Sequence, residues 1–325
     1  MAIKTWLTET VGVRVPVVQG GMMWVGRAEM TSAVANAGGL GFLTSLTQSN
    51  PEALRQEIRR CRTMTDKPFG VNITMLPSIN APDYLGYARV AVEEGIKVVE
   101  TAGNPDPVLP FLKKNNVIVI HKCVSLDHAL KAEAKGVDLS NVPDTAESVN
   151  DITSMILLGR CAQELKIPFL ASGGFCDGNG LAAALIFGAQ GINMGTRWMC
   201  TVESPIHQSV KEEIVRLDEN STIVVLRKFR NSTRLAKNEI SLEVSKIENS
   251  KLDPKFDEVA HLMSGVRGRK VYETGDINAG VWTVGQAAGL IKDIPTCVEL
   301  AKRIEREAAD ALSRESSRFS SNAHI

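Results

Sequence analysis

Two glycine-rich turns, separated by one strand–helix–strand unit, constrain the fold of this chain more than any other feature. They lie in residues 168–201, PFLASGGFCDGNGLAAALIFGAQGINMGTRWMCT, where one apolar run ends at Gly173-Gly174 and the next ends at Gly195-Thr196. The segment between them is rich in helix formers. Consecutive apolar strands that are joined by a helix indicate the parallel sheet of an α/β protein.

Such turns suit the binding of a phosphate group. In a β/α barrel, the loops after the seventh and eighth strands form a phosphate site at the C-terminal face, helped by a helix N-terminus. Glycine is favoured there because backbone N–H groups must approach the phosphate oxygens without an intervening Cβ. The pair of turns therefore predicts a phosphate site. Ordinary left-handed turns of an α/β protein are the alternative interpretation.

The alternation of strands and helices extends over most of the chain. Near-continuous apolar runs, each followed by a helix-like segment, are typical of strands buried in a parallel sheet. Counting them gives eight β/α units, which predicts a closed TIM (β/α)8 barrel rather than an open sheet. The weakest strand candidate is residues 137–142, because Asp138 and Asn141 interrupt it. The expected strands are residues 15–19, 40–46, 69–76, 97–101, 117–123, 137–142, 169–171 and 191–194.

The pattern changes after Thr201. We expect residues 202–274 to form a smaller, mostly helical second domain, in which residues 241–261 read as an amphipathic helix. The barrel domain then comprises residues 1–201 together with residues 275–325, which return to it. Its glycine-punctuated stretch GDINAGVWTVGQAAG suits a loop that passes over the barrel mouth.

Composition argues against several classes of partner. Lys plus Arg and Asp plus Glu both number 37, so the formal charge is zero and gives no electrostatic basis for binding nucleic acid or an anionic membrane. No apolar run approaches the roughly 20 residues of a membrane span, and the N-terminus lacks the apolar core of a secretory signal. The six cysteines are scattered without a CxxC pair, which predicts reduced thiols, no metal site and a cytoplasmic protein. The oligomeric state stays open.

A set of motifs runs in order along nearly the whole chain. They are VVQGGMMWVGRAEM, NAGGLGFLTSLTQ, DKPFGVNITMLPS, GIKVVETAGN, VIHKC, HALKAEAKGVD, ASGGFCDGNGLAAAL, INMGTRWMCT, HLMSGVRGRKVYETGD and GVWTVGQAAGLI. On these motifs the chain resembles the nitronate monooxygenase family, formerly called 2-nitropropane dioxygenases. Within that family it is most similar to the FMN-dependent NADH:quinone reductases.

The resemblance implies a TIM barrel with a small second domain and non-covalent FMN across the barrel mouth, with NAD(P)H as co-substrate. It implies that Asn72 hydrogen-bonds the flavin and that Lys122 faces its pyrimidine edge, where positive charge stabilises the reduced ring. The alternative for these two residues is a solvated side chain at a strand end. The flavin ring is expected to lie against the backbone of Gly20, Gly21 and Met22. The phosphate is expected at Ser172, Gly173, Gly174, Asn193, Met194, Gly195 and Thr196.

Histidine placement separates this chain from its relatives. His121 precedes Lys122 in a strand and must face the opposite way, which predicts a structural histidine behind the sheet. Related enzymes carry a histidine beside the flavin in the loop after the sixth strand, and in nitronate-oxidising members that histidine is the catalytic base. Here the segment reads GVDLSNVPDTAESVN, which is about four residues shorter than the related pattern and contains no histidine. No catalytic base is therefore identified.

The sequence thus predicts an FMN-dependent oxidoreductase that acts as an NAD(P)H:quinone-type reductase. Three alternatives stay open at this point. The first is oxidation of alkyl nitronates with oxygen, and the second is a flavin-binding protein that has lost catalysis through the altered sixth loop. The third is a phosphate-sugar isomerase without flavin, which would need acid and base residues at the barrel mouth.

Overall fold

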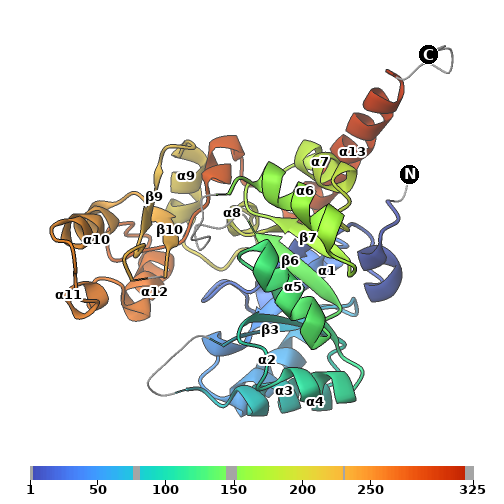
Figure 1. Cartoon of the computed structure of the whole chain (residues 1–325), viewed down its shortest axis with the longest axis horizontal. Helices are drawn as coiled ribbons and strands as arrows, with labels where there is room; N and C mark the ends of the chain where they lie inside the picture. The colour runs from blue at the N-terminus through green and yellow to red at the C-terminus, as the bar shows by residue number, and fades with distance from the viewer. Residues whose placement is uncertain (1–2, 76–80, 144–151, 230, 319–325) are drawn as a thin grey trace.

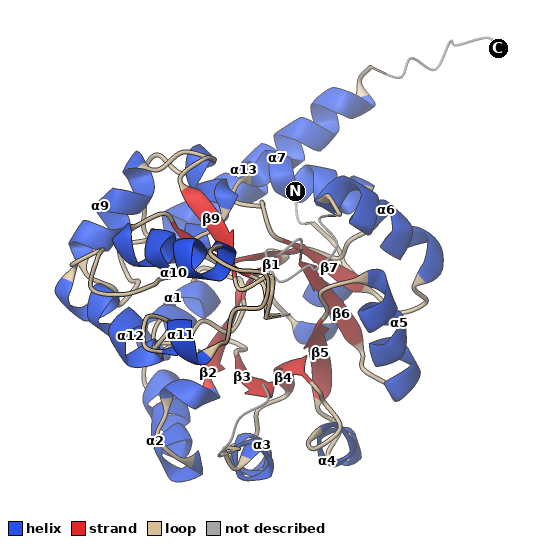
Figure 2. Ribbon diagram, turned by 60° about the vertical axis from the view of Figure 1, so that its left-hand side comes forward, coloured by secondary structure: helices blue, strands red, loops and turns tan. Residues whose placement is uncertain are grey.

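Eight parallel strands close into a barrel in the order of the chain, which confirms the predicted TIM barrel. The computed structural model describes residues 3–75, 81–143, 152–229 and 231–318. Closure is made by β1 beside β8, with Val17 level with Ile192. Figure 2 shows the ring of strands inside its layer of helices. The strands are β1 (Val17–Gln19), β2 (Leu40–Thr44), β3 (Gly70–Met75), β4 (Val98–Gly103), β5 (Ile118–Lys122), β6 (Leu139–Pro143), β7 (Phe169–Ser172) and β8 (Ile192–Met194).

The apolar residues of the strands fill both faces of the barrel wall. One cluster joins side chains of six strands across the barrel interior, among them Val18, Phe42, Ile120 and Leu170. Leu7, from the short π-helix η1 (Leu7–Val11), belongs to the same cluster. The opposite faces of the strands pack against the outer helices in one large core. Because the interior cluster fills the depth of the barrel, its strand ends are left for polar side chains.

Helices follow the strands and cover the outside of the barrel. Asn50, Asp83, Ser125 and Asp177 cap their N-termini by accepting hydrogen bonds from backbone N–H groups of the first turn. The barrel helices are α1 (Ala28–Asn36), α2 (Pro51–Arg62), α3 (Tyr84–Glu93), α4 (Leu109–Lys114), α5 (Leu126–Lys135), α6 (Ser154–Glu164), α7 (Gly178–Ile186), α8 (Thr196–Met199) and α13 (Cys297–Ser316). Two 3₁₀ segments join them, η2 (Ser45–Thr47) and η3 (Gln286–Leu290).

The weakest predicted strand is formed. β6 pairs with β5 and β7, with Asn141 level with Lys122 and Leu170. Asp138, whose polarity made this strand doubtful, lies just before it and accepts a hydrogen bond from the Val119 backbone N–H at 2.8 Å. Its carboxylate also pairs with Lys113. Asp138 therefore joins β5 to the start of β6 instead of interrupting it.

The segment from α9 to α12 forms a smaller unit beside the barrel (Figure 1). It has its own apolar cluster, which includes Val225, Leu235, Val244 and Val259. The predicted boundaries at residues 201 and 275 stay a prediction. The elements of this segment are α9 (Gln208–Arg216), β9 (Thr222–Val225), β10 (Thr233–Ala236), α10 (Glu239–Asn249), α11 (Asp257–Ala260) and α12 (Gly265–Thr274). Of these, α9 and α12 bury Val210, Ile214 and Val271 in the large core.

Two details of this unit differ from the prediction. β9 and β10 form an antiparallel pair that was not predicted. The single helix expected over residues 241–261 was wrong, because α10 ends at Asn249 and α11 begins at Asp257. Pro254 lies in the interval, where its ring and missing N–H oppose helix continuation.

Several properties of the described residues bear on the classes of function considered above. No helix among them combines the length and the apolar character that crossing a bilayer requires. Over the same ranges, no group of three or more His, Cys, Asp or Glu side chains could hold a metal ion. All six cysteines are buried and free.

Candidate functional site

The polar side chains of the strands gather at the carboxyl ends of the barrel. Residues in phase with the interior apolar side chains must face inward, because side chains alternate along a strand. Val98 and Ile120 belong to the interior cluster, so Glu100 on β4 and Lys122 on β5 face inward as well. Further inward polar residues include Thr44 on β2, Asn72 on β3, Asn141 on β6, Ser172 on β7 and Asn193 on β8.

Glu100 lies at the centre of this group. Its side chain is 0% exposed, and its Oε2 accepts hydrogen bonds from the Gly21 backbone N–H at 2.7 Å and from Asn72 Nδ2 at 2.8 Å. Its Oε1 accepts a hydrogen bond from Asn141 Nδ2 at 3.1 Å. The carboxylate thus connects β4 to the turn after β1, to β3 and to β6.

A second set of bonds connects β7, β8 and β1. Asn193 Oδ1 accepts a hydrogen bond from the Gly20 N–H at 2.9 Å, and Asn193 Nδ2 donates to Ser172 Oγ at 3.2 Å. The turn after β1 is also fixed from the other side, because the Met22 N–H donates to Thr44 Oγ1 at 2.9 Å. Gly20, Gly21, Asn72, Ser172 and Asn193 are therefore brought together by these hydrogen bonds. Their contact with a flavin stays a prediction.

The glycines of the site fall into two kinds. A Cβ on Gly20 would lie 2.8 Å from Glu100 Oε1, and a Cβ on Gly21 would overlap the Asn72 side chain. A Cβ on Gly195 would meet only the sulfur of Met22, at 3.9 Å, and a Cβ on Gly174 would meet nothing within 4 Å. Protein atoms thus fill the space beside Gly20 and Gly21, whereas the space beside Gly174 and Gly195 is open.

The first predicted phosphate turn has the backbone that requires glycine. Gly173 and Gly174 have φ angles of 79° and 83°, which side-chain-bearing residues rarely adopt. Gly195 has a φ of −107°, so its backbone would accept other residues. The reason for glycine at position 195 is therefore the space that its missing side chain leaves.

The side chains of Thr196 and Met194, two other residues predicted to hold the phosphate, make contacts within the protein. The Thr196 hydroxyl accepts a hydrogen bond from the Gly285 N–H at 2.9 Å, which places the returning loop against the end of β8. The Met194 side chain is 1% exposed and belongs to the core outside the barrel wall. Only the backbone of Met194 is therefore available to a ligand at the barrel mouth.

Lys122 and His121 face opposite sides of the barrel wall, as predicted. Lys122 is half-buried and lies level with Ala102, two residues nearer the mouth than Glu100. His121 is buried behind the sheet, with its Nδ1 2.8 Å from Thr101 Oγ1. Burial, reinforced by the charge of Lys135, lowers the pKa of His121 to about 4. His121 is therefore neutral at neutral pH and has no access to the mouth.

The thiols beside the predicted site residues are unreactive. Cys123 follows Lys122, and Cys176 follows the first glycine turn. Burial raises the pKa of each thiol to about 12, so both stay protonated at neutral pH. Neither cysteine offers a nucleophile to the barrel mouth.

Sequence reasoning missed Glu100, Asn141 and Thr44. A single ionisable residue inside the apolar strand VVETAG is a signal that could have identified Glu100, since an unpaired charge is rarely buried. Asn141 was noted only as an interruption of β6. In the structure that interruption is a polar residue of the site.

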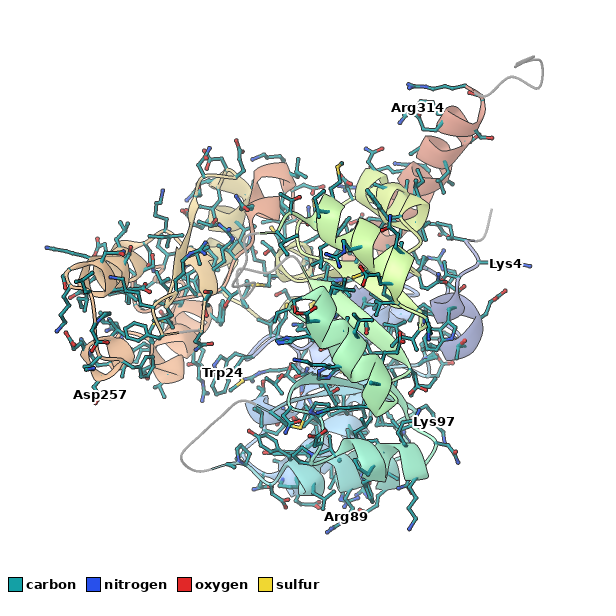
Figure 3. All side chains as sticks on the ribbon, viewed as in Figure 1. Lys4, Trp24, Arg89, Lys97, Asp257 and Arg314 are labelled. Atoms are coloured by element: carbon teal, nitrogen blue, oxygen red, sulfur yellow. The ribbon has the colours of Figure 1, made fainter. Side chains whose placement is uncertain are left out.

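The smaller unit contacts the turn after β1 through Trp24. The Trp24 ring lies under the guanidinium of Arg269 on α12, with the Arg269 Cζ 5.0 Å from the ring centroid. Trp24 has a φ of 67°, and its N–H donates to Thr47 Oγ1 at 3.1 Å. Figure 3 shows Trp24 between the barrel and the smaller unit. The smaller unit therefore borders the barrel mouth on the side of β1.

The residues at the mouth fit a flavin mononucleotide. Open space adjoins the backbone of Gly174 and Gly195, where a phosphate would have to lie. Asn141 Oδ1 is buried without a hydrogen-bond partner among the described residues, so it can accept a bond from a ligand N–H. The histidine-free sixth loop begins at the end of β6, and its residues 144–151 lie outside the described ranges.

Comparisons with known proteins agree with this geometry. A model of the nitronate monooxygenase family matches residues 4–307. The chain is 31% identical to "(3aS,4S,5R,7aS)-5-hydroxy-7a-methyl-1-oxo-octahydro-1H-indene-4-carboxyl-CoA dehydrogenase" of Mycobacterium tuberculosis, over 95% of this chain and 97% of that protein. It is 33% identical to the protein of the same name from Rhodococcus jostii, over 96% of this chain and 97% of that protein. The predicted family is confirmed.

Among solved structures, FabK from Thermotoga maritima is similar over its whole length. The TM-score is 0.89 at 30% identity, and the alignment covers 98% of this chain and 100% of FabK. The arrangement of the barrel with its smaller unit is therefore shared with that protein.

Proposed function

The chain belongs to the nitronate monooxygenase family of oxidoreductases, and on this premise we propose that it is an FMN-dependent reductase that oxidises NAD(P)H and reduces a quinone-type acceptor. The observation that carries the proposal is the open space beside Gly174 and beside Gly195, where the nearest protein atom to a Cβ on Gly195 is the Met22 sulfur at 3.9 Å. With a phosphate held there, the turn after β1 and the inward residues of β3, β4 and β5 would be left to line the ring.

Residues at the barrel mouth are suited to bind the phosphate of FMN and to stabilise its reduced ring. FMN bound there supplies the hydride acceptor and the electron donor. Backbone N–H groups at Gly174, Gly195 and Thr196 hold the phosphate, as such groups do in glycine turns. Lys122 places a positive charge at the mouth, which favours negative charge on the ring. None of these roles needs a side chain that exchanges protons.

We expect the purified protein to carry FMN rather than FAD. The site has one phosphate position, made by the turns after β7 and β8, and the chain has no GxGxxG dinucleotide motif after a strand. Heat release of the cofactor followed by chromatography identifies it. Stoichiometric FAD would contradict this expectation. A colourless protein that does not take up added FMN would instead support the isomerase alternative.

We expect Lys122→Met to lower the midpoint potential of the bound flavin. Methionine keeps the length of the side chain and removes the charge that stabilises the reduced ring. The expected change is at least tenfold in the ratio of reduced to oxidised flavin, or about 30 mV for two electrons. Lys122→Arg is the control, because it keeps the charge and should leave the potential near that of the wild type. An unchanged potential in Lys122→Met would show that Lys122 does not face the ring.

A nitronate-oxidising function is disfavoured by the histidines. Removing the proton of a neutral nitroalkane to form the nitronate calls for a base with a pKa near working pH, and histidine meets this need. His121 faces away from the barrel interior, and the other histidines of the described residues do not lie on barrel strands. Hydride transfer from NAD(P)H does not require such a base. The residues therefore support the reductase over the nitronate monooxygenase. An inert flavin-binding protein is the remaining alternative from the sequence.

A second candidate function follows from the relatives. Two proteins that are 31% and 33% identical over nearly their whole length are named as dehydrogenases of a carboxyl-CoA compound. This observation favours a CoA thioester as the substrate that exchanges a hydride with the flavin. Anaerobic reduction of the flavin by an acyl-CoA thioester, but not by NADH or NADPH, would favour this second candidate.

A further inference from the structure

Glu100 is an unusual residue for the middle of a barrel. Desolvating a carboxylate costs several kcal/mol, so a fully buried one persists only where hydrogen bonds compensate. Three donors on three different elements do so here, at 2.7, 2.8 and 3.1 Å. The Gly21 N–H can only donate. Both oxygens of Glu100 therefore act as hydrogen-bond acceptors.

The turn after β1 is shaped around this carboxylate. Gly20 cannot carry a Cβ because that atom would lie 2.8 Å from Glu100 Oε1. Gly21 donates its N–H to Glu100 and leaves room for the Asn72 side chain, which bonds the same carboxylate. The buried side chain of Glu100 on β4 therefore explains why two glycines follow β1. Its hydrogen bonds join β4 to the turn after β1 and to β6.

Glu100 and Lys122 form two levels of opposite charge. Both face inward, on the neighbouring strands β4 and β5, and Lys122 is level with Ala102. Lys122 is half-buried at the mouth, and Glu100 is fully buried beneath it. A charge deep in the protein is screened less by solvent than a charge at the surface. The field of Glu100 therefore reaches a ring that lies across the mouth.

We propose that Glu100 is a positioning residue that holds the turn after β1 against the flavin and lowers the flavin's reduction potential through its buried charge. This inference rests on the proposed function. Its negative charge opposes the charge that the ring gains on reduction, whereas Lys122 favours that charge. A lower potential makes the bound flavin a stronger donor to the acceptor substrate.

The test compares two variants that disturb the same turn but differ in charge. Glu100→Gln removes the charge and keeps the size of the side chain. Thr44→Val removes the hydrogen bonds that fix Met22 of the same turn and keeps Glu100 with its charge. Midpoint potentials are measured on the FMN-loaded proteins by anaerobic equilibration with reference dyes. FMN dissociation constants are measured alongside.

We expect Glu100→Gln to raise the ratio of reduced to oxidised flavin at a fixed potential at least tenfold, or about 30 mV for two electrons. Thr44→Val should leave the potential near that of the wild type, because it keeps the carboxylate and its three donors. A purely structural role for Glu100 would move both variants in the same direction. An unchanged or lowered potential in Glu100→Gln would overturn the proposal.

Glu100→Asp gives a second readout if Glu100→Gln does not retain FMN. Its shorter side chain keeps the charge but cannot reach the Gly21 N–H while bonding Asn72 and Asn141. We expect it to bind FMN at least tenfold more weakly, and wild-type affinity would overturn the positioning role. A wild-type protein that takes up no FMN overturns the proposed function and this inference together. A flavin-loaded wild type with an unaffected Glu100→Gln overturns only the role of Glu100.

Discussion

Gly195→Val should abolish stable FMN binding and leave the fold intact. The valine side chain would project into the open space beside the turn, where the nearest protein atom to its Cβ is the Met22 sulfur at 3.9 Å. Its methyl groups would occupy the phosphate position and keep the backbone N–H donors from it. Loss of two charge-assisted hydrogen bonds, each worth about 1.5–3 kcal/mol, weakens binding roughly a hundredfold or more.

The stability of this variant should stay close to that of the wild type. Gly195 has a φ of −107° and a ψ of −77°, which lies outside the left-handed region that favours glycine, so valine should cost far less stability here than FMN affinity. Gly159→Val on α6 is the matched control, because its Cβ also meets nothing within 4 Å but lies outside the barrel. FMN affinity is measured by fluorescence titration, and stability by thermal unfolding of the flavin-free proteins. Full FMN affinity in Gly195→Val would show that this turn is not the phosphate site.

Gly21→Ala should destabilise the protein itself. The added methyl group would overlap the Asn72 side chain, which cannot move aside without losing its 2.8 Å hydrogen bond to Glu100. Overpacking of this kind costs about 1–3 kcal/mol, and an unsatisfied buried carboxylate adds to the loss. FMN binding should weaken as well, because the turn that faces the ring is displaced.

Comparing Gly195→Val with Gly21→Ala distinguishes a turn that leaves space for a ligand from a turn that is packed against protein atoms. Gly265→Ala, at the start of α12, is the control for Gly21→Ala, since its Cβ meets nothing within 4 Å. The flavin-free proteins are compared by urea unfolding. If Gly21→Ala is as stable as Gly265→Ala, the prediction is wrong. The network around Glu100 would then tolerate a displaced Asn72.

The barrel could be predicted because each of its units is encoded locally. Apolar runs of strand length, helix caps such as Asn50 and Ser125, and glycine stops such as Gly136 mark the elements within a few residues. The left-handed Gly173 and Gly174 confirm that the first turn required glycine. Parallel pairing of consecutive strands then follows from the helices between them.

The smaller unit was harder to predict because its elements are short and charged. β9 and β10 have four residues each and pair only with one another, so no alternating pattern distinguishes them from loops. The break between α10 and α11 was marked by Pro254, but the charged pattern on both sides resembles one amphipathic helix. The secondary structure of these segments is determined by tertiary packing rather than by local sequence pattern.

The polar network of the site could not be predicted from local patterns. Glu100 contacts residues that are 28, 41 and 79 positions away in the chain. Only the closed barrel brings those positions together. Sequence reasoning therefore found Gly20, Gly21 and Asn72 through resemblance but attributed them to the flavin alone. In the structure these residues also have a role within the protein, because they surround or bond the buried carboxylate of Glu100.

The measurement that tests the central claim most directly is anaerobic reduction of the bound flavin. Purified, FMN-loaded protein is mixed in separate reactions with NADH, NADPH, a propyl nitronate and an acyl-CoA thioester, and the loss of oxidised flavin absorbance is followed. We predict rapid bleaching by NADH or NADPH. Bleaching by the nitronate should be slower than bleaching by NADH or NADPH. Bleaching by the nitronate or the thioester with no reaction toward NADH or NADPH, or no bleaching by any of the four, would contradict the proposed reductase.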